Sequence, residues 1–251
     1  MNVTFDPATV SAIALIAVRI AAFLAIAPPF SSTAFPLQLK AALSVLLALV
    51  LVPRVAAGYT EQDTGPFLLA LVFAAVTGAA LGFLVYIAFA AVQVSGSFLD
   101  QFGGFAAAEQ YDPGAGTNGA QFTRLYQMTA LALLFASDGY QLILGGLVRS
   151  FTAIPIAAHV DIDRVAQSLA GSVTQLFVSA LQIAGPTIVV LFLANVALGL
   201  LTRVSPAMNA FTLGPPAFTL VTVLLTGFGI VALPAAVNAL AASAGQLIGG
   251  L

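Results

Sequence analysis

The chain has 251 residues, of which 61% are hydrophobic and only 6% are charged, and its formal net charge is −2. Soluble domains carry roughly 25% charged residues, so this composition predicts an integral membrane protein whose apolar surface is covered by lipid or other subunits. The weak net charge gives no support to nucleic-acid binding. The absence of cysteine excludes disulfides, thiolate metal sites and cysteine nucleophiles.

Apolar runs long enough to span a membrane, which takes about 20 residues, follow one another along the chain. We expect spans at residues 8–27, 37–52, 67–99, 125–148 and 165–201. The third run would form a helix of about 50 Å, longer than a hydrocarbon core of about 30 Å, so it must tilt, bend or leave the bilayer. The sequence therefore predicts an all-α, polytopic membrane protein that forms a single domain over residues 1–251.

Helix-breaking residues interrupt two of these runs and also the apolar segment that follows Arg203. Ser137-Asp138-Gly139 interrupts the fourth run, and Gly185-Pro186 is expected to bend the fifth because proline removes a helix hydrogen bond. After Arg203 the chain is uncharged, and we expect Gly214-Pro215-Pro216 and Pro234 to divide it into separate helical pieces. If the segment after Arg203 is counted as a sixth span, the basic residues divide equally between the two sides of the membrane. Charge therefore does not orient the chain.

Two pairs of glycines are spaced four residues apart, Gly78 with Gly82 and Gly245 with Gly249. This spacing allows helix backbones to approach closely in a membrane. Packing within the chain is the favoured interpretation, ahead of a contact with another subunit.

The segment from Asp100 to Arg124 differs from the rest of the chain. It holds five glycines and one proline between two apolar runs. A loop of this length with no structure of its own is uncommon and usually functional, and irregular backbone at membrane depth is tolerated only where protein buries it or water lines it. We expect the function of the protein to depend on this loop.

Few polar residues elsewhere suggest chemistry. Asp138, the one carboxylate within a span, is a candidate proton relay, although it reads more simply as a helix break that caps the next turn or pairs with Arg149 or Arg124. Arg19 either snorkels to an interface or pairs with a carboxylate of a neighbouring helix. His159, the only histidine, lies beside Asp161 and Asp163, where we expect a solvated loop and not a metal site.

Further along the chain, Asn195 is a polar residue within a long span, and Arg203 ends that span and is expected to anchor it at the interface. We find no phosphate-binding glycine loop, no nucleophile elbow and no paired-carboxylate site. The sequence therefore does not predict an enzyme, and no cofactor or metal is expected.

The chain resembles the FliR family of flagellar export-gate proteins, whose injectisome relatives are the SctT proteins, from about Arg19 to Pro234. Any one of the four blocks that carry the resemblance is unspecific, but all four occur in order and at family-like spacing. Ala207 departs from the family, which usually has glutamine there, so we expect a local contact at that turn to differ. The blocks are Arg19-Ile-Ala-Ala-Phe-Leu-Ala-Ile-Ala-Pro-Pro-Phe with Pro36 and Lys40; Leu81-Gly-Phe with Ala88-Phe-Ala-Ala-Val and Gly96; Tyr111-Asp-Pro with Asp138-Gly-Tyr; and Asn195-Val-Ala-Leu-Gly-Leu-Leu-Thr-Arg-Val-Ser-Pro with Met208-Asn-Ala-Phe.

The resemblance implies a subunit of a helical export-gate ring in the bacterial inner membrane, at the flagellar basal body. FliP and FliQ homologues would complete the ring, FlhB and FlhA would be neighbours, and unfolded flagellar subunits would pass through the central channel. The family's channel plug maps onto about residues 105–122. The predicted plug positions are Phe105, Glu109, Tyr111, Asp112, Pro113, Gly114, Gly116, Asn118, Gly119 and Phe122.

Two other classes of function remain open. A secondary transporter would place a substrate site at the Gly-Pro breaks near the midplane, but it would usually show internal symmetry and more polar groups within the spans. A purely structural membrane scaffold would differ from the gate only in having no conduction pathway. For the loop itself, the alternative to a plug is an ordinary interhelical loop outside any pore.

Overall fold

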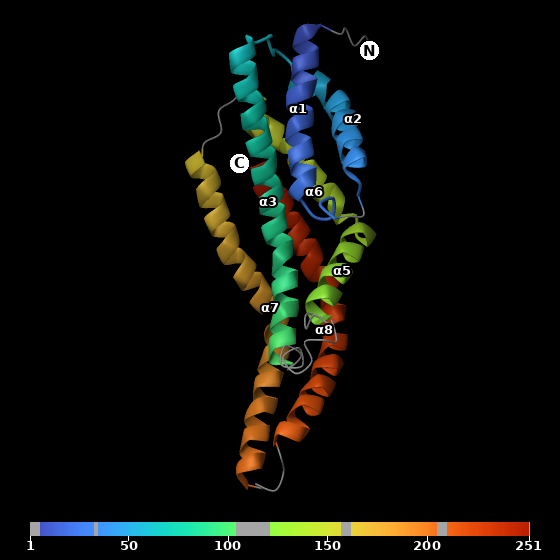
Figure 1. The fold of residues 1–251 in the computed structure, drawn as a ribbon, viewed down its shortest axis with the longest axis vertical. Helices are drawn as coiled ribbons and strands as arrows, with labels where there is room; N and C mark the ends of the chain where they lie inside the picture. Colours follow the sequence, from blue (N-terminus) through green and yellow to red (C-terminus); the bar gives the residue numbers. More distant parts are fainter. Residues whose placement is uncertain (1–5, 33–34, 104–120, 157–161, 205–209, 251) are drawn as a thin grey trace, which may run out of the picture. The chain divides into compact units, whose positions relative to one another are not determined.

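A computed structural model describes residues 6–32, 35–103, 121–156, 162–204 and 210–250. Within these ranges every regular element is a helix, which confirms the predicted all-α fold (Figure 1). The helices are α1 (Pro7–Ile26), α2 (Leu37–Val55), α3 (Thr64–Phe102), α5 (Gln121–Ala136), α6 (Gly139–Ala153), α7 (Ile162–Val204) and α8 (Ala210–Gly249).

The helices fall where the apolar runs predict them. Within the described residues, five helices are long and apolar enough to cross a membrane, and α5 with α6 would make a sixth span. α3 and α7, with 39 and 43 residues, are both longer than a bilayer requires. The polytopic membrane fold is therefore confirmed.

The expected division of the last segment is wrong, because α8 continues through Gly214-Pro215-Pro216 and Pro234 as one helix of 40 residues. α7 likewise continues through Gly185-Pro186, and the expected bend there stays a prediction. A proline within a helix removes one backbone hydrogen bond, and in membrane helices local adjustments and neighbouring groups satisfy what it frees. The other hydrogen bonds of the helix are enough to keep it continuous.

The chain forms two compact units. The first consists of residues 1–88, 138–173 and 240–251, and the second of residues 89–137 and 174–239. Since α3, α7 and α8 each contribute to both units, the two units are continuous through three helices, and the single domain stays a prediction.

In the first unit, α1 buries one continuous stripe of side chains. The buried residues recur every three or four positions, from Ala12 through Ile16 and Ile20 to Leu24, which is the spacing of one helix face. α2 and the first half of α3 lie beside α1 in Figure 1. This stripe is one side of the core of the first unit, to which α6 adds Ile143, Leu147 and Phe151.

The predicted glycine pairs pack inside the first unit. A Cβ atom at Gly78 would overlap the carbonyl oxygen of Arg19, and one at Gly82 would lie 2.9 Å from the carbonyl oxygen of Phe23. On α8, a Cβ at Gly245 would lie 2.6 Å from the Leu142 carbonyl oxygen of α6. Both pairs therefore bring helix backbones into contact within the chain, which confirms the favoured interpretation of this spacing.

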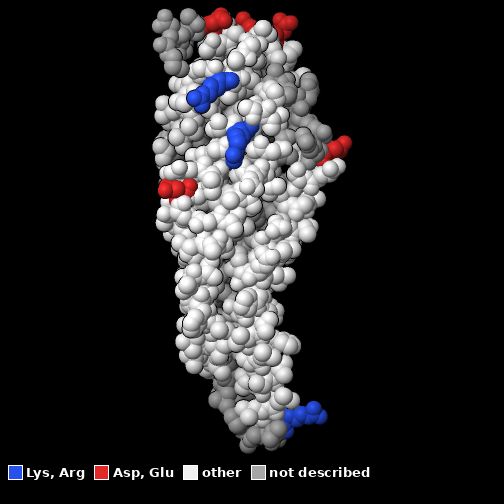
Figure 2. Space-filling view, turned by 180° about the vertical axis from the view of Figure 1, so that it is seen from behind, with Lys and Arg blue, Asp and Glu red and all other residues white. Residues whose placement is uncertain are grey.

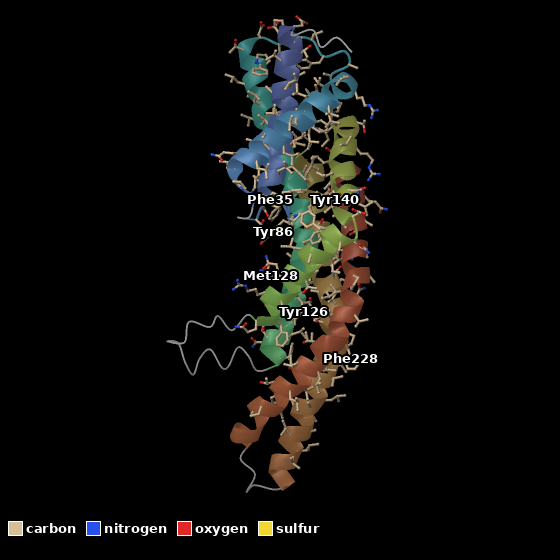
Figure 3. The ribbon with its side chains drawn as sticks, turned by 90° about the vertical axis from the view of Figure 1, so that its right-hand side faces the viewer. Phe35, Tyr86, Tyr126, Met128, Tyr140 and Phe228 are labelled. Carbon is tan, nitrogen blue, oxygen red and sulfur yellow. The ribbon has the colours of Figure 1, made fainter. Side chains whose placement is uncertain are left out.

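The second unit contains the latter part of α3, all of α5 and long stretches of α7 and α8. The end of α7 and the beginning of α8 run side by side in opposite directions in Figures 1 and 3. α5 buries Phe122, Tyr126, Ala130 and Leu134 at intervals of four residues. On this face, Phe122 meets α3 and Tyr126 meets α8.

Much of the surface is apolar. On α2 the side chains of Leu37, Leu46 and Val50 are 60–77% exposed, and on α8 those of Phe228 and Val231 are 78–79% exposed. Figure 2 shows the same property over one face, where few charged side chains interrupt an uncharged surface. Exposed apolar surface on this scale is typical of lipid contact or of contact with other subunits.

Candidate functional site: the base of the glycine-rich loop

The predicted plug positions fall almost entirely outside the described residues. Phe122 is described, and it is buried with 6% of its side chain exposed. The two helix ends that flank residues 104–120 are also described, namely the end of α3 and the beginning of α5. We call this region, where the two helix ends meet, the loop base.

The carboxylate of Asp100 joins the two helix ends. Its Oδ1 accepts a hydrogen bond from the backbone N–H of Phe122 at 2.9 Å, and its Oδ2 accepts one from the backbone N–H of Thr123 at 2.9 Å. The Thr123 hydroxyl also donates to Oδ2, at 2.7 Å. Asp100 is 95% buried, with 5% of its surface exposed. We call this arrangement the Asp100 clasp.

The clasp places a negative charge at the N-terminus of α5, where the helix dipole leaves a partial positive charge. The N-terminus of a helix carries unpaired N–H groups and a partial positive charge, which a carboxylate stabilises. The first turn of α5 contains no acidic residue of its own, so the anion comes from α3. Hydrogen bonds to a charged group contribute about 1.5–3 kcal/mol each. The clasp is therefore a strong local connection between residues that are 22 positions apart.

Two glycines, Gly96 within α3 and Gly103 directly after its last residue, allow the close approach. Gly96 lies one turn before Asp100, and Gly103 lies one turn after it. A Cβ at Gly96 would lie 2.7 Å from the carbonyl oxygen of Phe122, and one at Gly103 would lie 2.6 Å from the Oγ1 of Thr222 on α8. At Gly96 the backbone of α3 therefore contacts the backbone of α5, and Gly103 contacts the Thr222 side chain of α8.

α5 also packs closely against α8. The side chain of Tyr126 is 1% exposed, and a Cβ at Gly229 would lie 2.7 Å from its hydroxyl oxygen. Figure 3 shows Tyr126 among the helices of this unit and Phe228 on α8. α3, α5 and α8 thus form a closely packed support for the two ends of the loop.

Arg19 lies inside the first unit, and among the described residues it makes neither of the contacts expected from the sequence. It is 1% exposed, so it does not snorkel. Its Nη1 donates to the carbonyl oxygen of Ile154 at 2.7 Å and its Nη2 to that of Pro155 at 3.4 Å, while its guanidinium carbon lies 4.5 Å from the centroid of the Phe151 ring. A cation at the C-terminus of α6 complements the helix dipole, which explains why carbonyl oxygens replace the expected carboxylate.

Asp138 forms the break between α5 and α6, as predicted. Its backbone is left-handed, with φ 56° and ψ 16°, and its side chain is exposed. The expected cap is wrong, because no side-chain hydrogen bond closes α6 at this residue. An N-cap residue normally takes an extended conformation to reach back to the helix, and Asp138 does not. Arg149, one of its expected partners, instead donates to the carbonyl oxygen of Gly245 at 3.4 Å.

The remaining candidates show local contacts only. Asn195 is exposed and donates to the carbonyl oxygen of Leu191 in its own helix, at 3.0 Å. Arg203 is exposed in the last turn of α7, and its anchoring role stays a prediction. His159 and Asp161 lie outside the described residues. Within the described part of the chain, no group of three or more His, Cys, Asp or Glu residues is placed to hold a metal ion.

Sequence reasoning placed Asp100 in the loop but gave it no role. One signal was available: Gly96, Asp100 and Gly103 lie at i, i+4 and i+7, which puts a carboxylate between two small residues on one helix face. The missing acid in the first turn of α5 was a second signal. Neither identifies Phe122 and Thr123 as the partners, because that requires the tertiary packing of α5 on α3.

The long apolar helices and the charged connection at the loop base define a polytopic helical membrane protein with one specialised interhelical segment. Residues 10–244 match the family described as "Bacterial export proteins, family 1". The chain therefore belongs to this family and is a membrane-embedded component of a bacterial export apparatus.

Individual relatives agree with this membership. The chain is 30% identical over 217 residues to the flagellar biosynthetic protein FliR of Pectobacterium carotovorum, which covers 86% of this chain and 83% of the relative. It is 28% identical over 205 residues to FliR of Bacillus subtilis, covering 80% and 79%. It is also 26% identical over 182 residues to the Yop proteins translocation protein T of Yersinia pestis, covering 71% and 70%.

Proposed function

We propose that this protein is a subunit of a flagellar type III export gate in the bacterial inner membrane. With FliP and FliQ homologues it forms the channel through which unfolded flagellar subunits leave the cytoplasm, with FlhB and FlhA homologues as neighbours. The family match over residues 10–244 carries the proposal. Two FliR proteins that match over about four-fifths of the chain support a flagellar role.

The partner proposal is tested by assembly. The tagged chain is co-expressed with the FliP and FliQ homologues of the same genome, extracted in mild detergent and weighed by native mass spectrometry. We expect a particle containing this chain together with both partners. A stable particle that contains only this chain would contradict the proposal.

We further propose that the glycine-rich loop is the resting plug of the channel. Glycines adopt unusual backbone dihedrals at little steric cost, so such a loop can enter a narrow lumen and be displaced by a substrate chain. The clasp supports this assignment, because it fixes both ends of the segment to one packed support. A plug must be anchored at its ends if it is to return to the same place after each substrate.

The plug proposal is tested by deleting residues 107–120 while leaving Asp100, Phe122 and Thr123 in place. We expect the assembled complex in proteoliposomes to leak small ions at rest, since the barrier is gone and the surrounding helices remain. A second variant replaces residues 107–120 by a Gly-Ser segment of equal length. It shows whether the ion leak depends on the sequence of the loop or only on its length. An assembled deletion complex that stays tight to ions would contradict the proposal.

A further inference from the structure

The Asp100 clasp does more than cap the N-terminus of α5. A helix N-terminus is usually capped by a residue immediately before it in the chain, whereas the carboxylate that caps α5 belongs to α3 and comes from the other side of the loop. Breaking these hydrogen bonds would therefore remove a cap and also release one end of the loop from the other.

The hydrogen bonds of Asp100 are arranged so that they would form and break together. All three donors are neutral groups, namely two backbone N–H groups and one hydroxyl, and all belong to the first turn of α5. They are spread over both carboxylate oxygens, so a single rotation of the Asp100 side chain would break them together. Gly96, which lies one turn before Asp100, leaves room for the backbone of Phe122 and Thr123 directly against α3, so the donors lie within reach of the carboxylate.

We infer that Asp100 is a positioning residue that ties the end of α3 to the beginning of α5 and so keeps the distance between these two helix ends fixed. Its effect on conduction rests on the proposed plug function. Its effect on the distance between the two helix ends does not.

The distance can be measured directly because the chain has no cysteine of its own. Cysteines at the exposed positions Gln101 and Leu125 carry spin labels, in the complex with partner subunits whose cysteines have been replaced by serine. Pulsed electron paramagnetic resonance then reports the distribution of distances across the loop base. With Asp100 present we expect one narrow distribution.

Asp100→Ala should broaden this distribution, and the ion leak of the resting complex should rise about tenfold, since one charge-assisted hydrogen bond corresponds to about one power of ten in an equilibrium constant. Asp100→Asn keeps one acceptor oxygen and should give an intermediate width. Should Asp100→Ala fail to assemble, Asp100→Asn provides the measurement. Asp163→Ala, which removes an exposed acid from the first turn of α7, is the matched control and should change neither property.

A second variant distinguishes the connection between α3 and α5 from the electrostatic capping of α5. Asp100→Ala combined with Gln121→Glu places an acid in the first turn of α5 itself, which restores the favourable helix electrostatics without connecting α5 to α3. We expect the distribution to stay broad. A narrow distribution in Asp100→Ala, in Asp100→Asn or in this double variant would overturn the inference. A broad distribution without added leak would support the tie and contradict the plug.

Discussion

Arg19 of α1 donates from Nη1 to the carbonyl oxygen of Ile154, 2.7 Å away, at the residue that directly follows α6. The two residues are 135 positions apart in the chain. Asp100 makes the opposite connection at the beginning of α5. The outer ends of the two short helices are therefore both held by side chains of other helices, a cation at the C-terminus of α6 and an anion at the N-terminus of α5, each of the sign that the helix dipole favours.

The Arg19 contact predicts that the substitution that keeps the charge, Arg19→Lys, destabilises the protein at least as much as Arg19→Met, which removes it. Arg19→Met should lower the free energy of unfolding by about 1–3 kcal/mol, because it removes the donors to α6 but also removes the cost of a buried charge. Arg19→Lys should destabilise at least as much, since an ammonium is strongly hydrated and lacks the planar fork of the guanidinium. Thermal unfolding in detergent measures both.

Arg54→Met is the control for Arg19, because Arg54 is exposed at the end of α2, and the change should stay within about 0.5 kcal/mol. If Arg19→Lys keeps the stability of the unmodified protein, the hydrogen-bond geometry does not matter and this account of Arg19 is wrong.

The glycine contacts predict which added methyl groups the protein tolerates. Gly78→Ala should destabilise by about 1–3 kcal/mol or more, because its Cβ overlaps the carbonyl oxygen of Arg19 and helix backbone cannot move aside easily. Gly145→Ala in α6 has no atom within 4 Å of the added Cβ. That variant should be neutral or more stable by up to about 1 kcal/mol, from helix propensity. Equal effects of the two substitutions on thermal unfolding would contradict the packing of α3 on α1.

Much of the fold follows from the sequence, because a spanning helix is defined by the length of an apolar run. The break at Asp138 and the packing of both glycine pairs were predicted from local pattern alone. The contacts of Arg19 and Asp100 were not, since both residues bind backbone groups of distant helices, and backbone groups carry no sequence signal. The continuity of α8 through Pro234 was also missed, because neighbouring groups and local adjustments in a membrane helix satisfy the backbone group that a proline frees.

The left-handed backbone of Asp138 predicts how this position responds to substitution. Asp138→Gly should be neutral or stabilising, and Asp138→Asn should be tolerated, since both residues adopt this conformation readily. Asp138→Val should cost at least about 1–2 kcal/mol, because a β-branched side chain fits it poorly. Protein export by Asp138→Asn should also keep the pH dependence of the unmodified protein if the residue acts as a turn. A changed pH profile in that variant would restore the proton-relay hypothesis.

The Asp100 clasp predicts a measurable coupling between Asp100 and Thr123. Thr123→Val removes one donor and keeps the backbone N–H, so it should destabilise by about 0.5–1.5 kcal/mol, and Asp100→Ala should cost more because three hydrogen bonds are lost together. In the double variant the loss should be smaller than the sum of the two single losses, by about 0.5–3 kcal/mol, as for residues in direct contact. Thermal unfolding of the three variants and the unmodified protein gives the coupling energy. Strictly additive losses would mean that the hydroxyl and the carboxylate do not interact, and the clasp would then rest on the backbone N–H groups alone.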